Sequence, residues 1–275
     1  MIVVIGGGTM GGGIAVSAVL AGEQVRVIES SAELVASAEE RVRASLDRAA
    51  GRRDRAVEAV ALQELVEFGT EHHPDRVDLV IEAVPEITAL KQEIFSGLED
   101  IYSHDTVFAS NTSSLSITEI AEVLERQERF VGMHFFNPVP ASALVEIVVG
   151  TQTSDDTVDQ VRKLGEAMGL TPIVVQDSPG FASSRLGLTL GLEAIRMVES
   201  GVASAQDIDA AMTLGYKHPI GPLKLTDLVG LDVRLAIAEH LASTLGGRFE
   251  PPELMRSMVA EGKLGKKTGE GFYVW

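Results

Sequence analysis

Residues 2–14 read IVVIGGGTMGGGI, an apolar, β-branched run that passes directly into glycines. The run predicts a short buried strand over Ile2–Ile5. The small and apolar residues that follow predict a helix over Met10–Leu20 that packs against a sheet. A strand that enters a helix through a glycine turn is typical of a nucleotide-binding βαβ unit.

Three glycines in this turn, Gly6, Gly8 and Gly11, have the GxGxxG spacing. The first permits the tight turn, the second lets the backbone approach a pyrophosphate, and the third lets helix and strand pack closely. Free N–H groups at the helix N-terminus would bind the phosphates. Glu29 ends the next predicted strand, where a carboxylate accepts hydrogen bonds from the adenosine ribose. Serines rather than arginines follow it, so the pattern predicts an NAD site and favours NAD over NADP.

Further strands and helices alternate along the chain until Val175. The strands are predicted at Val25–Ile28, Val77–Ala83, Thr106–Ser110, Phe130–His134, Leu144–Val149 and Thr171–Val175. The helices are predicted over about Leu34–Ala49, and over Ala56–Val66, Ile87–Tyr102, Ile117–Leu124 and Asp155–Met168. Apolar strands that alternate with helices predict a mostly parallel sheet that is covered on both faces.

The stretch Asp177–Gly180 reads DSPG and is the predicted linker, because the strand pattern ends before it. Beyond it only helices are predicted, at Phe181–Ser200, Ala205–Leu214, Leu231–Leu245 and Pro252–Glu261. We therefore expect an α/β fold in two domains. Residues 1–176 would form a Rossmann-type NAD-binding domain, and residues 177–275 would form an all-α C-terminal domain.

The composition limits the class of protein. The formal net charge is −17, which argues against binding nucleic acid because phosphate backbones are bound by basic surfaces. There are no cysteines, so disulfides and thiolate metal sites are excluded. No apolar run approaches the roughly 18–20 residues of a membrane span. A cytoplasmic enzyme without a nucleic-acid or membrane partner is expected.

One segment departs from the acidic composition. Six arginines lie between residues 41 and 55: Arg41, Arg43, Arg48, Arg52, Arg53 and Arg55. They could form ion pairs on a helix surface with acidic neighbours such as Glu39. They could equally bind a polyphosphate or an acidic partner, and the residues alone leave both interpretations open.

A second group of polar residues lies near the ends of predicted strands. His134 ends one strand and Glu146 lies in the next. A carboxylate beside an imidazole fixes its tautomer and raises its basicity, as a general base requires. Ser113 and Asn137 add a hydroxyl and an amide near the edge where open α/β sheets bind ligands. This set can move a proton to or from an alcohol oxygen, so an NAD-linked alcohol dehydrogenase is predicted.

The remaining histidines lack such neighbours, and we expect all of them to be surface or loop residues: His72, His73, His104, His218 and His240. No group of residues has the spacing of metal ligands, so no metal is expected.

Several longer motifs follow one another along the chain: VIEAVPE at 80–86, SNTSSLSIT at 110–118, GMHFFNPVP at 132–140 and GKLGKKTGEGFY at 262–273. With these motifs and its glycine turn, the chain resembles the short-chain L-3-hydroxyacyl-CoA dehydrogenases, including bacterial 3-hydroxybutyryl-CoA dehydrogenases, nearly from end to end. The resemblance implies an NAD-dependent enzyme that interconverts a short-chain 3-hydroxyacyl-CoA and its 3-oxoacyl form.

The resemblance also implies roles for the residues at matching positions. His134 would be the general base that removes the 3-hydroxyl proton and returns it in the reverse direction. Glu146 would orient His134, and Ser113 would hydrogen-bond the reacting oxygen. Asn111 would lie near the nicotinamide and the substrate, and Asn137 would support the same pocket.

Other implied contacts lie farther from the reacting atoms. Glu86 and Lys91 match family positions that contact the cofactor. Ser45 and Arg52 fall where the family holds the CoA nucleotide, which would give the arginine-rich segment a function. The family further implies a homodimer that forms through the helical C-terminal domains.

One position departs from the family pattern. Residues 179–185 read PGFASSR, and Ser184 stands where the family usually has an asparagine that helps to bind the substrate. Loss of a needed hydrogen bond typically costs about 1–3 kcal/mol, so Ser184 either binds through a water or belongs to a pocket reshaped for another acyl group. The alternatives are the same chemistry on a substrate held by an acyl carrier protein in polyketide building-block synthesis, action on a free hydroxy acid, or a non-catalytic NADH-binding protein.

Overall fold

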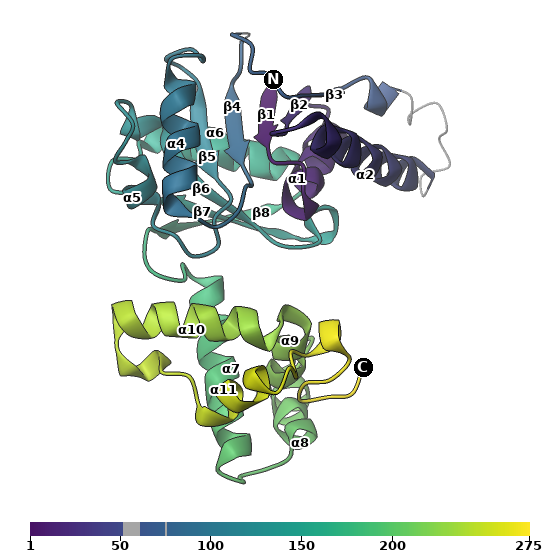
Figure 1. Ribbon diagram of the computed structural model, residues 1–275, viewed down its shortest axis with the longest axis vertical. Helices are drawn as coiled ribbons and strands as arrows, with labels where there is room; N and C mark the ends of the chain where they lie inside the picture. The colour runs from purple at the N-terminus through teal and green to yellow at the C-terminus, as the bar shows by residue number, and fades with distance from the viewer. Residues whose placement is uncertain (52–60, 75) are drawn as a thin grey trace. The chain divides into compact units, whose positions relative to one another are not determined.

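A computed structural model describes residues 1–51, 61–74 and 76–275 (Figure 1). The chain forms two compact units, Met1–Ser178 and Pro179–Trp275, and each is described by itself. The first is an α/β unit and the second is helical, which is the fold class expected from the sequence. The division lies within the predicted linker. No helix in the described ranges combines the length and the apolar character needed to cross a lipid bilayer.

The described part of the first unit contains an eight-stranded sheet with the order β3-β2-β1-β4-β5-β6-β7-β8. Its strands are β1 Ile2–Ile5, β2 Val25–Ile28, β3 Val66–Gly69, β4 Leu79–Glu82, β5 Val107–Ser110, β6 Phe130–Phe135, β7 Leu144–Val149 and β8 Thr171–Gln176. Neighbouring strands are parallel except for β6 and β7, which are antiparallel. The prediction of a mostly parallel sheet is therefore confirmed.

The register of the strands brings their carboxyl ends together. Ile5 at the end of β1 pairs with Ile28 of β2 and with Glu82 of β4, and Glu82 pairs with Ser110 of β5. Loops that leave these ends run side by side along one edge of the sheet. Open α/β sheets bind ligands at this edge. Six of the predicted site residues lie in these loops: Gly6, Gly8, Glu29, Glu86, Asn111 and Ser113.

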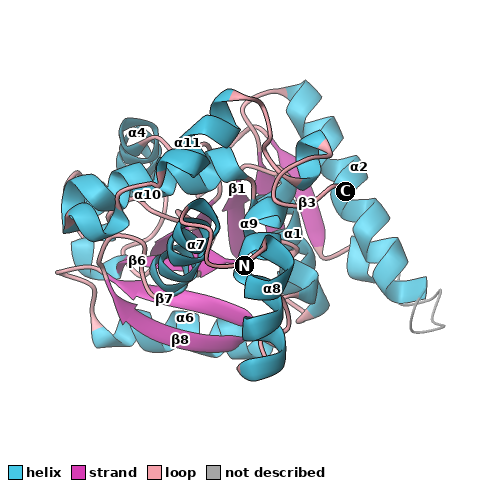
Figure 2. Ribbon diagram, turned by 90° about the horizontal axis from the view of Figure 1, so that it is seen from below, coloured by secondary structure: helices cyan, strands magenta, loops and turns pink. Residues whose placement is uncertain are grey.

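Helices cover both faces of the sheet (Figures 1 and 2). They are α1 Thr9–Leu20, α2 Ala32–Gly51, α4 Thr88–Glu99, α5 Ile117–Ala121 and α6 Asp155–Ala167. One continuous core joins α1, α2 and α6 to the strands. On the other face Phe95 of α4 packs against Phe108 and Phe130, with ring centroids 5.8 and 4.8 Å apart. Burial on both faces explains why the central strands β1, β4, β5 and β6 are largely apolar rather than alternating.

The predicted helix Ala56–Val66 is wrong at its end. Residues 52–60 lie outside the described part, and Val66 begins β3 instead of ending a helix. The strand is only four residues long and lies at the edge of the sheet. An ion pair of 3.0 Å between Arg26 of β2 and Glu67 of β3 links it to the neighbouring strand. A short apolar run fits a strand and a helix equally well, so periodicity alone does not separate them.

The second unit is a group of helices around its own core. Its elements are α7 Ser183–Glu199, α8 Ala205–Ala210, a π-helical turn Ala211–Gly215, α9 Pro222–Val229, α10 Leu231–Leu245 and α11 Glu253–Ala260. Helix α9 was not among the predicted helices. Proline is well suited to the first turn of a helix, where its missing N–H has no partner to lose.

Asp227 in α9 explains the closing motif GKKTGEGFY. Its carboxylate is 1% exposed and accepts hydrogen bonds from the backbone N–H groups of Phe272 and Tyr273, each at 2.9 Å. A third bond comes from the Trp275 indole at 2.9 Å. A side chain at Gly271 would lie 2.3 Å from the same carboxylate, so only glycine fits there. The hydrogen bonds to Asp227 therefore hold the last residues of the chain against α9.

Candidate active site

The glycine turn has the geometry that its spacing predicts. Gly6 has φ +89°, and a Cβ there would lie 2.9 Å from the carbonyl oxygen of Ala83. A Cβ on Gly11 would lie 1.7 Å from the carbonyl oxygen of Gly6, so helix and turn are in close contact. At Gly8 a Cβ would meet nothing within 4 Å, which leaves its backbone accessible to a ligand. Helix α1 begins directly after it, as phosphate binding requires.

Glu29 lies beside this turn and is tied to it. Its Oε1 accepts a hydrogen bond of 2.6 Å from the N–H of Gly7. A Cβ on Gly7 would lie 2.4 Å from the Cβ of Ala38 in α2, so Gly7 must also be glycine. The sequence analysis missed this requirement, although the run of three glycines was the signal. Glu29, Gly6 and Gly8 line one pocket of about 770 Å³, which fits the adenosine end of NAD.

Glu86 organises the loop that follows β5. Its Oε1 accepts hydrogen bonds from the Thr112 hydroxyl at 2.6 Å and from the N–H groups of Ser113 at 2.8 Å and Ser114 at 3.2 Å. Burial by itself would raise the pKa of Glu86, but the Thr112 hydrogen bond, the Lys91 ammonium and the Ser113 N–H together hold the pKa below its ordinary value. The loop that carries Ser113 is therefore anchored on a carboxylate.

Lys91, expected to contact the cofactor, is buried with 1% exposure. Its ammonium donates to Glu82 Oε1 at 2.6 Å and to the Val84 carbonyl at 3.3 Å. Glu82 also accepts from the Ser110 hydroxyl at 2.6 Å and from the Val84 N–H at 2.6 Å. The sequence analysis missed Glu82 and Ser110. The overlooked signal was a carboxylate at the end of the apolar strand LVIE.

His134 and Glu146 are directly opposite each other on the antiparallel strands β6 and β7. His134 Nδ1 lies 2.7 Å from Glu146 Oε2, and the two residues are 7% and 0% exposed. The ring of Phe136 packs against the imidazole with centroids 4.5 Å apart. A buried carboxylate at this distance fixes the orientation of the ring.

The polar residues at this edge surround one pocket of about 350 Å³. It is lined by Met10, Ala83, Val84, Glu86, Asn111, Ser113, His134, Phe135, Phe136 and Asn137. Asn111 is fixed there because its Oδ1 accepts the N–H of Phe135 at 2.9 Å. The structure thus brings together a hydroxyl, an imidazole with its carboxylate and two amides, which is a set able to transfer a proton.

The three other predicted substrate residues are not among those that line this pocket. Ser45 is in the C-terminal half of α2, Arg52 lies outside the described residues, and Ser184 is in the first turn of α7 in the second unit. The structure therefore leaves their proposed contacts with a substrate as predictions.

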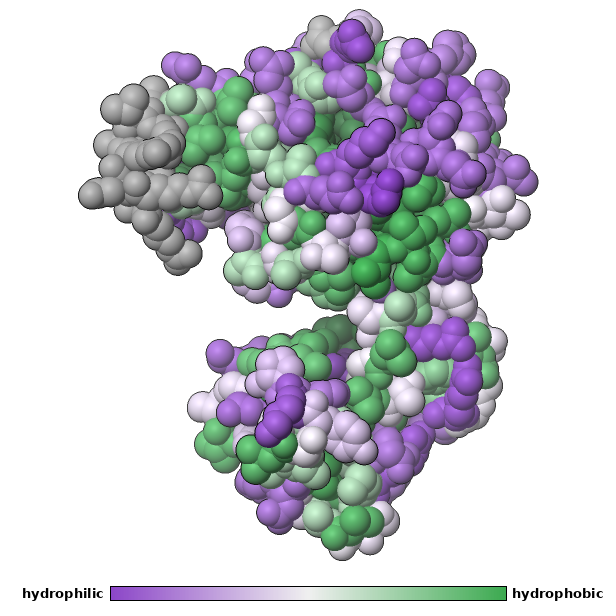
Figure 3. Space-filling model, turned by 180° about the vertical axis from the view of Figure 1, so that it is seen from behind, coloured by the Kyte–Doolittle hydropathy of each residue, from purple (hydrophilic) through white to green (hydrophobic). Residues whose placement is uncertain are grey.

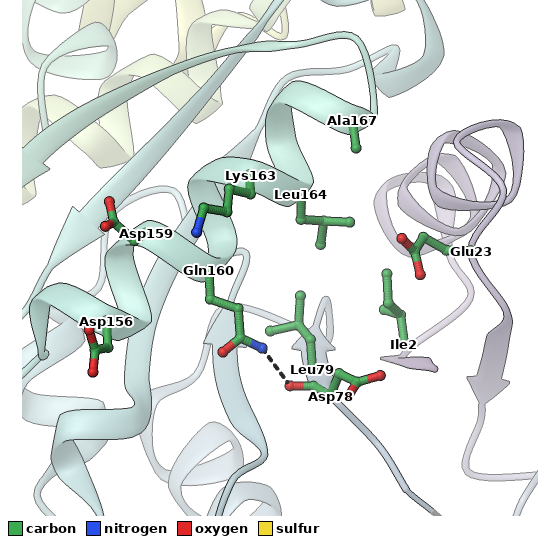
Figure 4. A pocket seen from close by; sticks show the side chains of 10 residues that line it. All are labelled: Ile2, Glu23, Asp78, Leu79, Asp156, Asp159, Gln160, Lys163, Leu164 and Ala167. Atoms are coloured by element: carbon green, nitrogen blue, oxygen red, sulfur yellow. Dashed lines mark hydrogen bonds between the residues drawn. The ribbon is translucent and has the colours of Figure 1, made fainter.

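Another hollow, of about 700 Å³, lies at the opposite edge of the sheet (Figure 4). It lies where β1 and β4 begin and is bordered by α6, whose Gln160 donates to the Asp78 carbonyl at 3.2 Å. Carboxylates and apolar side chains dominate its lining, and none of the predicted site residues is among them. The predicted site residues that line a pocket all lie instead at the edge formed by the carboxyl ends of the strands.

A Glu86→Gln variant should destabilise the protein at neutral pH by about 1 kcal/mol, a small effect because the side chain is 36% exposed and partly screened. The folded-state pKa lies below the ordinary 4.5, so the stabilisation is complete above that value and is lost as the pH falls through the folded pKa. Urea midpoints at neutral and acidic pH, with exposed Glu122→Gln as a control, should show the difference shrinking in acid. A difference that grows in acid would contradict the account.

Comparison with known families shows two matches that together span almost the whole chain. The model of the 3-hydroxyacyl-CoA dehydrogenase NAD binding domain matches residues 1–178, and that of the 3-hydroxyacyl-CoA dehydrogenase C-terminal domain matches residues 180–275.

Individual relatives are similar over at least 90% of their length. A probable 3-hydroxybutyryl-CoA dehydrogenase of Bacillus subtilis is 44% identical, with 99% of this chain and 96% of the relative covered. The human mitochondrial hydroxyacyl-coenzyme A dehydrogenase is 39% identical, with 99% and 90% covered. The crystal structure of (S)-3-hydroxybutyryl-CoA dehydrogenase from Ralstonia eutropha is 41% identical and superposes with a TM-score of 0.94, with 100% and 98% covered.

Proposed function

The chain belongs to the 3-hydroxyacyl-CoA dehydrogenase family and is an NAD-dependent enzyme of it, and on this premise we propose that it interconverts a short-chain 3-hydroxyacyl-CoA and the corresponding 3-oxoacyl-CoA. The observation that carries the proposal is the buried contact of 2.7 Å between His134 and Glu146 in the pocket at the carboxyl edge. A proton-transfer group beside an NAD site is the minimum that an alcohol dehydrogenase needs.

His134 is the proposed general base. Glu146 holds Nδ1, so proton exchange with the substrate is assigned to Nε2. In oxidation Nε2 takes the proton of the 3-hydroxyl, and the buried Glu146 carboxylate stabilises the resulting imidazolium. Ser113 hydrogen-bonds the reacting oxygen, while Asn111 and Asn137 position the substrate around it. Bound NAD⁺ supplies the two-electron oxidant.

The direct test mixes the purified protein with NADH and acetoacetyl-CoA and follows the loss of NADH absorbance. Oxidation that depends on acetoacetyl-CoA supports the proposal and shows that Ser184 is tolerated in place of asparagine. NADH binding without oxidation would overturn it. Activity confined to acetoacetyl groups on an acyl carrier protein would support the carrier-bound alternative instead.

The face of α2 that carries Ser45 supports CoA as the carrier. The Ser45 hydroxyl donates to the Arg41 carbonyl at 2.9 Å and accepts from Arg48 Nη2 at 2.8 Å, and Arg41 Nη1 donates to the Gly7 carbonyl at 2.7 Å. Arg43 differs, because Glu39 pairs with it at 2.7 Å. Within the described residues no carboxylate pairs with Arg41 or Arg48. The Arg48 guanidinium lies beside the Ser45 hydroxyl and has no carboxylate partner among the described side chains, which suits a phosphate of CoA.

An Arg48→Glu variant is expected to raise the KM for acetoacetyl-CoA by about tenfold, because a charged hydrogen bond to phosphate is replaced by repulsion. The KM for acetoacetyl-pantetheine, which lacks the nucleotide, should stay unchanged. Arg162→Glu on α6, where Arg162 pairs only with Asp159 among the described side chains, is the charge-matched control. An equal rise for both thioesters would contradict a nucleotide contact at Arg48.

We also propose that the protein is a homodimer formed through its second unit. Apolar side chains reach the surface of this unit (Figure 3), and on α7 Leu186 and Leu190 are 65% and 43% exposed. Large exposed apolar side chains on neighbouring turns of one helix are typical of interaction surfaces. Light scattering should give the mass of two chains, and the mass of one chain would contradict the proposal.

A further inference from the structure

The pocket at the glycine turn extends beyond the part that the ribose and phosphates need. Glu29 and the glycines occupy one end, and the rest continues along the inner face of α4 past Leu90, Ile94 and Gly97. A Cβ on Gly97 would meet nothing within 4 Å, so this wall is open. With the ribose on Glu29, the base of the dinucleotide would extend into this continuation, which is apolar enough to cover a purine ring.

One titratable side chain, His72, lines the continuation from the loop after β3. The ring is half-buried, and Nδ1 lies 2.8 Å from the hydroxyl of Tyr102, which is 4% exposed. The two rings meet edge to face, with centroids 5.8 Å apart and planes at 83°. The contact between His72 Nδ1 and the Tyr102 hydroxyl is the one hydrogen bond of the imidazole among the described residues. Tyr102 thus fixes the ring and leaves Nε2 for another partner.

The surroundings keep His72 neutral at physiological pH. Burial lowers the pKa of the imidazole, and the nearby His73 and Arg26 lower it further. A neutral imidazole that uses Nδ1 for Tyr102 offers Nε2 as either a donor or an acceptor, depending on the tautomer. It is therefore a hydrogen-bonding group and not a counter-ion for phosphate.

We propose that His72 Nε2 hydrogen-bonds the adenine base of NAD, which makes His72 a residue that determines cofactor affinity in this chain. Adenine carries a donor at N6 next to an acceptor at N7, so one edge of the base serves either tautomer. The inference rests on NAD binding and is independent of the acyl substrate. His72 lies in a loop, as expected from the sequence, and its ring also lines the pocket at the glycine turn.

Isothermal titration of ligand fragments tests the proposal. His72→Ala and His72→Phe should each weaken NADH and ADP-ribose by about fivefold, the size of one neutral hydrogen bond. Nicotinamide mononucleotide, which has no adenine, should bind both variants as it binds the unchanged protein. The phenylalanine variant keeps a ring against Tyr102, so it separates the lost nitrogen from lost packing.

The neighbouring His73 is exposed and does not line this pocket, so His73→Ala is the matched control and should leave all three affinities unchanged. Unchanged NADH affinity in both His72 variants would overturn the proposal. Equal weakening of nicotinamide mononucleotide and ADP-ribose would also overturn it, because the loss would then come from a general disturbance of the site. Neither outcome depends on turnover of an acyl substrate.

Discussion

The His134→Ala variant is expected to lose about 10³-fold in kcat for reduction of acetoacetyl-CoA while it binds NADH as tightly as the unchanged protein. The imidazole is the group assigned to give the carbonyl oxygen its proton, and alanine has no proton to give. NADH affinity should persist because His134 lies in the smaller pocket, whereas the glycine turn and Glu29 line the larger one. Steady-state kinetics and NADH fluorescence titration measure the two quantities.

Two further variants test whether the loss of kcat is specific to the proposed base and its carboxylate partner. Glu146→Gln keeps a hydrogen-bonding partner for Nδ1 but removes the charge that stabilises the imidazolium, so its kcat should fall by less than that of His134→Ala. His104→Ala, at an exposed position, should have no effect. Near-normal turnover in His134→Ala would show that another group moves the proton.

Lys91→Met should cost about 3–5 kcal/mol of stability, because it leaves the Glu82 carboxylate buried without its cation. Lys91 and Glu82 are 1% and 0% exposed and 2.6 Å apart. Water cannot reach the carboxylate that remains, and the hydrogen bonds from Ser110 and Val84 do not neutralise it. The urea midpoint of unfolding measures the loss.

The double variant Lys91→Met with Glu82→Gln provides the control. It removes both charges, so most of the lost stability should return, since a buried ion pair contributes little more than neutral groups of similar shape. A double variant as unstable as Lys91→Met alone would mean that the loss comes from packing. A Lys91→Met protein as stable as the unchanged one would contradict a buried pair at this position.

The parts of the site that the sequence predicted are those set by neighbours along the chain. The glycine turn is one case, because Gly6 and Gly11 are required by contacts within a single βαβ unit. The proximity of His134 and Glu146 is another, since the antiparallel strands β6 and β7 are consecutive and place the two residues opposite each other. Both features follow from the local sequence pattern and from short connections between consecutive elements.

The parts that the sequence did not predict depend on contacts between distant segments. Glu82 meets Lys91 and Ser110 only because β4 and β5 are adjacent and α4 covers them. His72 reaches the pocket at the glycine turn through a loop whose path its own residues do not indicate. Strand β3 was also not predicted. A four-residue edge strand forms through its pairing with β2, and it is too short to show a periodicity of its own.

The central claim is that this chain reduces a 3-oxoacyl-CoA with NADH, and its most direct test is product stoichiometry. The protein is incubated with NADH and acetoacetyl-CoA, and both NADH consumed and 3-hydroxybutyryl-CoA formed are quantified by chromatography. The account predicts equal molar amounts of the two, with no product from His134→Ala over the same time. NADH that binds but is not consumed, or is consumed without this product, would contradict it.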